Sequence, residues 1–158
     1  MGEPPRLSDR VGKEQLRNAA VLLLTLKGTP TIYYGEEIGM HDVQIPPDKV
    51  RDPRAKNEPG KNLGRDPQRT PLQWNAEKYA GFSKVEPWLP VASDYEKINV
   101  ALQKEDKNSL LHFYKELLDL RQKEPALHVG EYYPEALKGD VMVYRREFHD
   151  SRFVVAVN

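Results

Sequence analysis

The apolar residues of two separate stretches repeat with the period of an α-helix. In the first stretch, residues 13–27, they recur at the spacings that place them on one face of a helix. Further apolar residues lie outside that face, so we expect other elements to cover this helix on more than one side. The predicted face consists of Leu16, Ala19, Ala20, Leu23 and Leu24.

The second periodic stretch lies in the last third of the chain. Asp106 or Asn108 can cap its start, and Pro125 prevents it from continuing. At the other end of the chain, Pro4 and Pro5 exclude a helix from the first ten residues. The face of this second helix consists of Leu110, Phe113, Tyr114, Leu117 and Arg121.

A short buried strand is predicted after the first helix, at residues 31–34, which read Thr-Ile-Tyr-Tyr. Gly28 can end the helix in the left-handed conformation, and Pro30 blocks a return to helix. Gly35 then allows a sharp turn, which presents two carboxylates at the C-terminal end of the strand. Ligands of α/β proteins bind at that end of the strands.

Alternating apolar and polar residues predict a small antiparallel β unit after the second helix. Residues 138–140 and 149–151 are typical of the turns that would connect its strands. The predicted strands are residues 130–133, 141–147 and 152–157.

Residues 41–99 have little regular period and many prolines. A segment of that length without secondary structure is usually either functional or disordered. Its many aromatic side chains are too apolar to remain in water, which argues against disorder. We therefore expect an ordered loop of the kind that builds active sites.

Composition narrows the class of protein. The chain has 158 residues, 24 basic and 24 acidic side chains and no cysteine. One domain of ordinary size is expected. Balanced charge does not favour nucleic acid or an anionic membrane as a partner. The lack of cysteine fits a reducing compartment, and the apolar stretch 19–26 is too short to span a bilayer, so we expect a cytoplasmic protein.

Glu36 and Glu37 are the first candidates for chemistry. Glycoside hydrolysis needs two carboxyl groups about 5 to 9.5 Å apart on either side of one sugar. Adjacent residues of a strand point to opposite faces, so at most one of these two would face a pocket. The favoured interpretation is that they bind loop backbone or nearby arginines.

The most specific stretch reads Gly-Arg-Asp-Pro-Gln-Arg-Thr-Pro-Leu-Gln-Trp and spans residues 64–74. Arg65 and Arg69 supply rigid planar donors, and Asp66 between them supplies an acceptor. These groups suit either the recognition of sugar hydroxyls or a network that holds the loop in place, and both interpretations stay open from chemistry alone.

Aromatic residues of the same loop could stack on a sugar face, although loop aromatics more often anchor the loop to the body. Trp74, Phe82 and Trp88 are the candidates, with anchoring as the default interpretation. No histidine spacing is typical of a metal site, and we expect no metal and no cofactor.

The motif at residues 28–39, Gly-Thr-Pro-Thr-Ile-Tyr-Tyr-Gly-Glu-Glu-Ile-Gly, together with residues 64–74, strongly resembles the α-amylase superfamily, glycoside hydrolase family 13. The second motif resembles the branch that contains α-glucosidases, oligo-1,6-glucosidases and trehalose synthases. Further matches at residues 80–82, 87–90, 98–100 and 109–117 extend the resemblance over nearly the whole chain.

The resemblance implies an α/β fold and a fragment of a longer enzyme. Residues 1–126 would form the C-terminal portion of a (β/α)8 TIM barrel, with its last helix, strand and helix and one long loop. Residues 127–158 would begin the antiparallel β domain that follows the barrel. The strand at residues 31–34 would then lack both barrel neighbours, and its unpaired edges should cause self-association.

The resemblance also assigns roles to residues. The family's nucleophile and acid/base come from earlier strands, so no catalytic residue is expected here. Glu3 matches the position of the third family carboxylate, but the local sequence is Met-Gly-Glu-Pro-Pro-Arg where the family has Asn-His-Asp-x-Pro-Arg. Arg65 matches the arginine that recognises the non-reducing-end glucose, and Asp66 and Arg69 would order the loop. Any calcium-binding loop would lie upstream.

The implied function is that of a fragment of a retaining α-glucosidase-like hydrolase, inactive alone, whose parent acts on α-glucosidic sugars through a covalent glucosyl intermediate. Two alternatives remain open. One is a non-catalytic relative similar to the heavy subunits of amino-acid transporters, which carry a membrane anchor and would not be expected to keep the Arg65 motif. The other is a freestanding module that binds maltose-like sugars.

Overall fold

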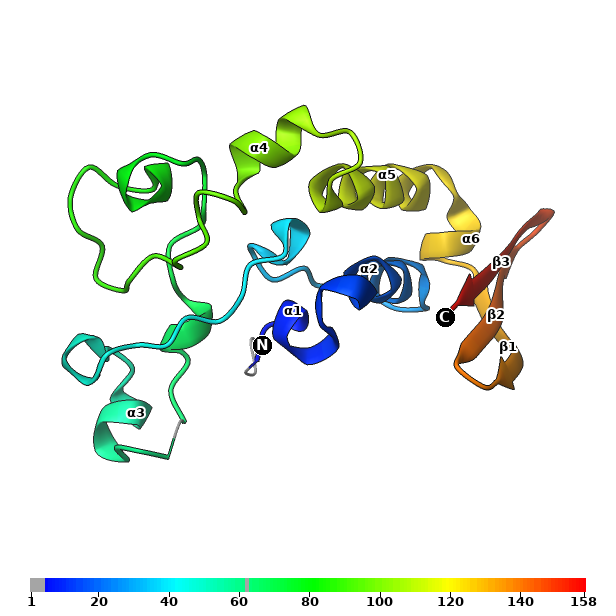
Figure 1. The fold of residues 1–158 in the computed structure, drawn as a ribbon. Coiled ribbons are helices and arrows are strands. Elements are labelled where there is room, and N and C mark those ends of the chain that lie inside the picture. Colours follow the sequence, from blue (N-terminus) through cyan, green and yellow to red (C-terminus); the bar gives the residue numbers. More distant parts are fainter. Residues whose placement is uncertain (1–4, 62) are drawn as a thin grey trace.

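Two features organise the chain: a pair of packed helices and a three-stranded antiparallel sheet. The computed structural model describes residues 5–61 and 63–158 (Figure 1). The sheet lies at one end of the molecule, and the segment 41–99 extends at the other (Figure 1). The elements are α1 (Leu7–Val11), α2 (Leu16–Thr25), α3 (Pro53–Asn57), α4 (Val100–Glu105), α5 (Leu110–Lys123), α6 (Pro125–His128), β1 (Glu131–Lys138), β2 (Val141–Phe148) and β3 (Ser151–Val157).

Helices α2 and α5 pack against each other through the apolar faces that the sequence predicts. Ala20 and Leu24 of α2 are fully buried against Tyr114 of α5. Burying a large apolar side chain contributes roughly 1.5 to 3 kcal/mol, so this contact is a main source of stability. Both predicted helices are therefore confirmed. Partly buried residues complete the cluster: Leu23, Ile32, Leu110, Phe113 and Leu117.

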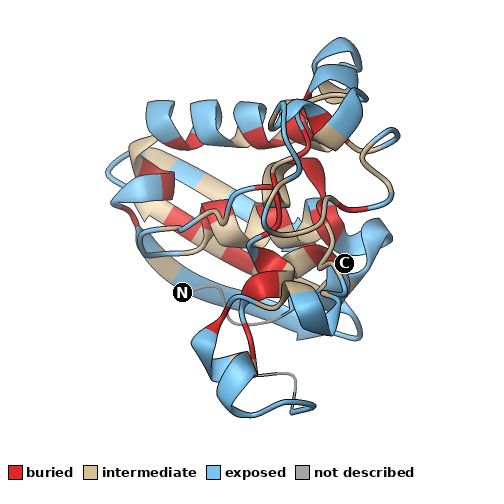
Figure 2. Cartoon of the chain, turned by 90° about the vertical axis from the view of Figure 1, so that its left-hand side faces the viewer, coloured by how far each residue is buried: buried red, intermediate tan, exposed pale blue. Residues whose placement is uncertain are grey.

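A second apolar cluster fastens the long segment to the helices. Ile38 and Met40 are buried against Val100 of α4 and Leu111 of α5, and Leu72 packs on them. Figure 2 shows buried residues gathered in the interior, whereas the outer sides of the helices are exposed. Leu72 belongs to the motif at residues 64–74, so this cluster fixes the position of that motif.

The three strands form an antiparallel sheet in the order β1-β2-β3, as predicted. Tyr144, which is fully buried, pairs with Pro134 on one side and with Val155 on the other. The register of β1 shifts between Pro134 and Ala136. A proline cannot donate to a central ladder, and its place in an edge strand beside an irregularity follows that rule.

Residues 31–34 do not form the predicted strand. Residues 31–33 have no regular structure, and Tyr34 and Gly35 form a turn. Within the described ranges 5–61 and 63–158, the sheet contains β1, β2 and β3 alone. A β-strand requires a neighbouring strand with which to exchange backbone hydrogen bonds. In the described part of the chain, residues 31–34 have no such neighbouring strand.

The sequence pattern does not predict helices α1, α3, α4 and α6, and it places the cap of α5 on the wrong residue. Helix α1 begins directly after Pro5 and Arg6, so the prolines precede this helix and do not exclude it. Helix α4 is capped by Asn99, whose side chain accepts a hydrogen bond from Leu102 N. Ser109, and not Asp106 or Asn108, caps α5 by accepting from His112 N. Serine and asparagine both satisfy the free amides of a first turn.

Two buried arginines connect the sheet to the helices. Arg121 of α5 donates to the carbonyl oxygens of Leu24 and Leu127, each at 2.7 Å, and of Gly28 at 2.6 Å. Arg146 of β2 donates to Thr25 O at 2.5 Å and to Gly130 O at 2.8 Å. Three of these carbonyls lie at or just beyond the C-terminus of α2, where helix carbonyls lack partners and cations are favoured.

No helix in the described part of the chain is long and apolar enough to cross a membrane. The predicted boundary between residues 126 and 127 falls inside α6. That division of the chain stays a prediction.

Candidate functional site

Arg65 is held by a buried carboxylate from a different part of the long segment. Asp52 Oδ2 accepts from the backbone amide of Arg65 and from its Nε, both at 2.9 Å. The Asp52 side chain is 1% exposed, whereas that of Arg65 is 50% exposed. The Nε atom of Arg65 is occupied by Asp52, whereas the two terminal nitrogens of the guanidinium have no described partner. These terminal nitrogens can donate to two neighbouring hydroxyls.

Asp52 also begins helix α3. Its Oδ1 accepts from Arg54 N at 2.9 Å, and Pro53 occupies the first helical position, where its missing N–H costs nothing. The hydrogen bonds from Arg65 and Arg54 hold the pKa of the Asp52 carboxyl well below its usual range. Asp52 is therefore negatively charged at neutral pH, and this buried carboxylate fixes the orientation of Arg65.

Asp66 is buried and orders the loop. Its Oδ2 accepts from the backbone amides of Arg51 at 2.6 Å and Asp52 at 2.8 Å, and its carbonyl accepts from Arg69 N at 2.9 Å. The two segments are thereby joined side by side, and Arg65 is brought next to Asp52. The carboxylate of Asp66 is directed to backbone amides and not to open solvent.

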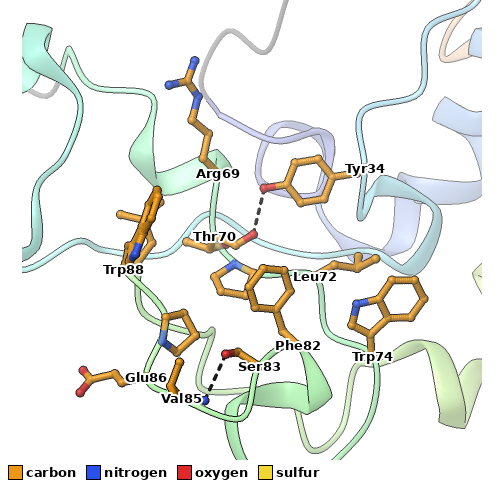
Figure 3. Close-up of a pocket in the computed structure, with 13 residues that line it drawn as sticks. Tyr34, Arg69, Thr70, Leu72, Trp74, Phe82, Ser83, Val85, Glu86 and Trp88 are labelled. Atoms are coloured by element: carbon orange, nitrogen blue, oxygen red, sulfur yellow. Dashed lines mark hydrogen bonds between the residues drawn. The ribbon is translucent and has the colours of Figure 1, made fainter.

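Arg69 stands at the rim of a pocket that the sequence did not predict. The pocket has a volume of about 580 Å³. Arg65 and Asp66 are not among its lining residues, so the structure separates the three predicted binding residues. In Figure 3 the Arg69 guanidinium points away from the aromatic side chains. The lining is formed by Tyr34, Arg69, Thr70, Pro71, Leu72, Trp74, Phe82, Ser83, Val85, Glu86, Pro87, Trp88 and Leu89.

The loop aromatics are exposed in this pocket and do not anchor the loop. Trp88 is 82% exposed, Phe82 52% and Trp74 47%. In the view of Figure 3, Phe82 lies between Trp88 and Trp74. The default interpretation that these residues anchor the loop is wrong, because all three rings are exposed. The apolar cluster that includes Leu72 holds the segment against the helices instead.

A left-handed turn supports two of these rings. Tyr79 and Ala80 both have positive φ, 58° and 57°, and Gly81 follows at 65°. This conformation costs a non-glycine residue about 1 to 2 kcal/mol. The buried Ala80 carbonyl accepts from Trp74 N at 2.9 Å and from Asn75 N at 3.1 Å, so the turn fixes the strip that carries Trp74.

Arg6 packs against Tyr34 and holds it in place. Its guanidinium is buried, lies 4.9 Å from the Tyr34 ring centre, and donates to Tyr34 O and Gln68 O, each at 2.5 Å. The Tyr34 hydroxyl in turn lies 2.9 Å from Thr70 O, which accepts from it (Figure 3). These contacts connect the turn after residue 33 to the motif at residues 64–74.

Glu36 and Glu37, the two consecutive glutamates, do not line the pocket. Glu36 Oε2 accepts from Tyr33 N at 3.1 Å, which agrees with the interpretation that this residue binds loop backbone. Glu37 Oε2 is buried without a described partner. Among the described residues that line the pocket, Glu86 supplies the one carboxylate, and it forms an ion pair with Lys49.

Glu3 lies outside the described residues. Within residues 5–61 and 63–158, no group of histidine and acidic side chains has an arrangement that could hold a metal ion. Sequence reasoning missed Asp52, although Asp52-Pro53 has the form of a helix start, with a capping aspartate followed by proline. It also missed the pocket, because the lining residues come together only through the fold.

Comparison with known proteins gives one family. The family model described as the catalytic domain of α-amylase matches residues 3–130. Among curated proteins, Maltase A1 of Drosophila melanogaster is 38% identical, over 96% of this chain and 27% of its own length. An oligo-1,6-glucosidase of Halalkalibacterium halodurans is 34% identical, over 99% of this chain and 32% of its own length.

Solved structures share the fold. The trehalose-6-phosphate hydrolase of Bacillus licheniformis matches with a TM-score of 0.85 and 30% identity, over 99% of this chain and 32% of its own. The trehalulose synthase of Pseudomonas mesoacidophila matches with a TM-score of 0.88 and 30% identity, over 100% and 33%. The chain thus spans between about a quarter and a third of the length of the relatives it matches.

Proposed function

This chain belongs to the α-amylase family, and we propose that it is the substrate-contacting part of a retaining α-glucosidase-like hydrolase that acts on α-glucosidic bonds. The observation that carries the proposal is the match of an α-amylase catalytic-domain model to residues 3–130. Relatives named as maltase and oligo-1,6-glucosidase support the α-glucosidic substrate class.

Arg65 is the residue that we assign to the sugar. Its free terminal nitrogens form a planar fork whose orientation is set by buried Asp52. Such a fork suits two neighbouring hydroxyls of one glucose ring. Asp66 and Arg69 maintain the loop around it, Asp66 through the backbone amides it binds and Arg69 from the rim of the pocket.

We propose that this chain does not hydrolyse glucosides by itself. A retaining glycosidase needs two carboxyl groups about 5 to 5.5 Å apart at the scissile bond. In the described part of the chain, the pocket offers only Glu86, which Lys49 already engages. Expected chemistry is therefore recognition of the substrate without cleavage.

Calorimetry with methyl α-D-glucopyranoside and maltose tests the assignment. We expect heat of binding for the purified chain, a loss of at least about tenfold in affinity for Arg65→Ala, and a similar loss for Arg65→Lys because lysine has no planar fork. Arg54→Ala, a change of another exposed arginine near Asp52, is the matched control. Absence of sugar binding, or equal binding by Arg65→Ala, would contradict the proposal.

A turnover assay tests the second part. The purified chain should release no p-nitrophenol from p-nitrophenyl α-D-glucopyranoside above the buffer rate. Measurable turnover that co-purifies with the 158-residue chain would overturn the proposed lack of activity while leaving the substrate class intact.

The family also suggests where the chain belongs in a larger fold. We propose that residues 1–126 correspond to the end of the TIM barrel and residues 127–158 to the start of the β domain, in a cytoplasmic protein. The β-prone residues 31–34 form no sheet contact here. We propose that they drive self-association, which light scattering over a range of protein concentrations would detect.

A further inference from the structure

We propose that strand β3 pairs edge to edge with the β3 strand of a second copy of this chain, so that the sheets of the two copies join into one continuous sheet. The inference goes beyond the proposed function and does not depend on it. It rests on the backbone groups and side chains of β3, the last strand in the sheet order β1-β2-β3. The sheet lies at the end of the molecule opposite α3 (Figure 1).

Three residues of β3 direct their backbone hydrogen-bonding groups away from β2. Residues 149–150 connect the two strands, and Phe148 pairs with Ser151 across this turn. The pair that flanks such a turn exchanges hydrogen bonds, and bonded and non-bonded pairs alternate along an antiparallel ladder. No strand in the described part of the chain lies beyond this edge of β3. The residues whose N–H and C=O groups face outward are Arg152, Val154 and Ala156.

The two edges of the sheet differ in how well they are protected from other strands. At the β1 edge, Pro134 has no N–H to donate, and the register shifts between Pro134 and Ala136. The β3 strand reads Ser-Arg-Phe-Val-Val-Ala-Val, without proline, and it pairs with β2 without a register shift. Prolines, bulges and charges are the features that keep edge strands from pairing. The β3 edge is therefore open to another strand, and the β1 edge is not.

The side chains of the outward-facing residues suit a copy of the same strand. Val154 is 66% exposed, although valine is a strand former that packs well against a neighbouring strand. The one charged side chain of β3, Arg152, is already engaged by Glu147 through its Nε. The 24 basic and 24 acidic side chains leave the chain without a net charge that would hold two copies apart.

Antiparallel pairing centred on Val154 makes the strand complementary to itself. A two-fold axis at this position places Val154 beside Val154 of the second copy and Arg152 beside Ala156 of the second copy. All three outward-facing residues then have partners. A register centred on Arg152 would instead place two guanidiniums opposite each other, and like charges at that position are destabilising. The sequence of β3 thus selects the register as well as the partner.

The proposed dimer is closed. A two-fold contact uses the β3 edge of both copies, which leaves only the β1 edges at the two ends of the joined sheet. Each of these edges has Pro134 and the adjacent register shift. Association should therefore stop at two copies and not continue into a fibre.

Sedimentation equilibrium of the purified chain over a wide range of concentrations measures the association. We expect a monomer and a dimer in equilibrium and no larger species. Amide hydrogen exchange then locates the contact. The amides of Arg152, Val154 and Ala156 should exchange at least about tenfold more slowly in the dimer, because pairing adds hydrogen bonds to these residues. The amide of Val155, which is bonded within the ladder to Tyr144, should change less.

Val154→Lys should abolish the dimer, because it places two ammonium groups together at the two-fold axis. The side chain that it replaces is 66% exposed, so the monomer should keep its fold. Val154→Thr keeps a β-branched residue and should keep the dimer. Leu137→Lys is the matched control, since it adds the same charge at an 80% exposed position of the protected β1 edge. It should leave the dimer intact.

Thr31→Lys separates this interface from the association proposed for residues 31–34, because Thr31 is exposed and lies far from β3 in the sequence. A dimer that Thr31→Lys abolishes and Val154→Lys does not would overturn the inference. A chain that stays monomeric at every concentration would also overturn it. So would a dimer of the parent chain in which exchange at Arg152, Val154 and Ala156 is unchanged, a result that needs no variant to fold. These outcomes leave sugar binding by Arg65 untouched, so the proposed function stands or fails separately.

Discussion

One oxygen of Asp52 binds Arg65 twice, through the backbone amide and through the side-chain Nε, each at 2.9 Å. The other oxygen of Asp52 caps helix α3 by accepting from Arg54 N. A single buried carboxylate therefore fixes both the position of the Arg65 backbone and the direction of its guanidinium. Asp52 acts as a positioning residue for the proposed glucose-binding group.

Asp52→Ala should lower both stability and sugar affinity. The change removes a helix cap, worth about 1 kcal/mol, and leaves charge-assisted hydrogen bonds unmade, each worth about 1.5 to 3 kcal/mol. We expect a loss of about 2 to 4 kcal/mol in the free energy of unfolding, measured by urea denaturation. Asp48→Ala, at an exposed position of the same segment, should change it by less than about 0.5 kcal/mol.

The contribution of Asp52 should depend on pH. Its hydrogen bonds with Arg65 and Arg54 lower its pKa in the folded protein below the ordinary value of 3.8. A carboxyl with a depressed pKa stabilises the fold fully above its unfolded pKa, and the stabilisation declines as the pH falls below that value. The difference in unfolding free energy between the parent and Asp52→Asn should thus be larger at pH 7 than at pH 3. A constant difference would contradict this.

Tyr114→Phe should leave the fold as stable or make it slightly more stable. Tyr114 is buried, and its hydroxyl has no described hydrogen-bond partner. Burial raises its pKa, with Glu36 and Glu37 adding to the shift. Removing an unpaired buried hydroxyl avoids its desolvation cost. Thermal unfolding should show a change between zero and about 1 kcal/mol in the stabilising direction.

Tyr144→Phe provides the comparison. This tyrosine is equally buried, but its hydroxyl is hydrogen-bonded to Thr25 Oγ1. Its removal should cost about 1 kcal/mol, since Thr25 then loses a partner. If the two Tyr→Phe variants destabilised the chain equally, the unpaired state of Tyr114 would be refuted.

Gly35→Ala should be far more damaging than Gly12→Ala. Both glycines have positive φ, 86° and 73°, so alanine is strained at either position. A Cβ at Gly35 would also come within 2.5 Å of Met40 Sδ and 3.1 Å of Arg6 Nη1, whereas nothing lies within 4 Å at Gly12. We expect about 1 kcal/mol for Gly12→Ala and at least about 3 kcal/mol for Gly35→Ala in chemical denaturation. Equal losses would show that Met40 moves aside freely.

Local patterns predicted the parts of the fold that depend on local chemistry. The apolar stripe of α2 and the alternation of β2 and β3 depend on residues close together in the sequence, and all three elements are confirmed. Residues 31–34 have equally strong β propensity, yet they form no strand because hydrogen-bond partners are not a local property. Helix α4 was missed because six residues carry too little periodicity, although Asn99 marks its start.

The candidate site was less predictable than the fold for a similar reason. The motif containing Arg65 was visible, but its partner Asp52 lies in a different turn of the long segment, and only the fold brings the two together. The exposure of Trp88 could not be read from composition, since aromatic loop residues are usually buried. Both features depend on contacts between segments, which a single sequence does not reveal.

The carbonyl-bound guanidiniums of Arg121 and Arg146 make the C-terminal sheet difficult to detach. Separating the two pieces at the proposed boundary would leave Arg121 without Leu127 O and Arg146 without Thr25 O, so each buried guanidinium would lose one of its carbonyl partners. Heat should accordingly melt helices and sheet in one transition. A graft of this sheet onto another protein would have to include the C-terminus of α2.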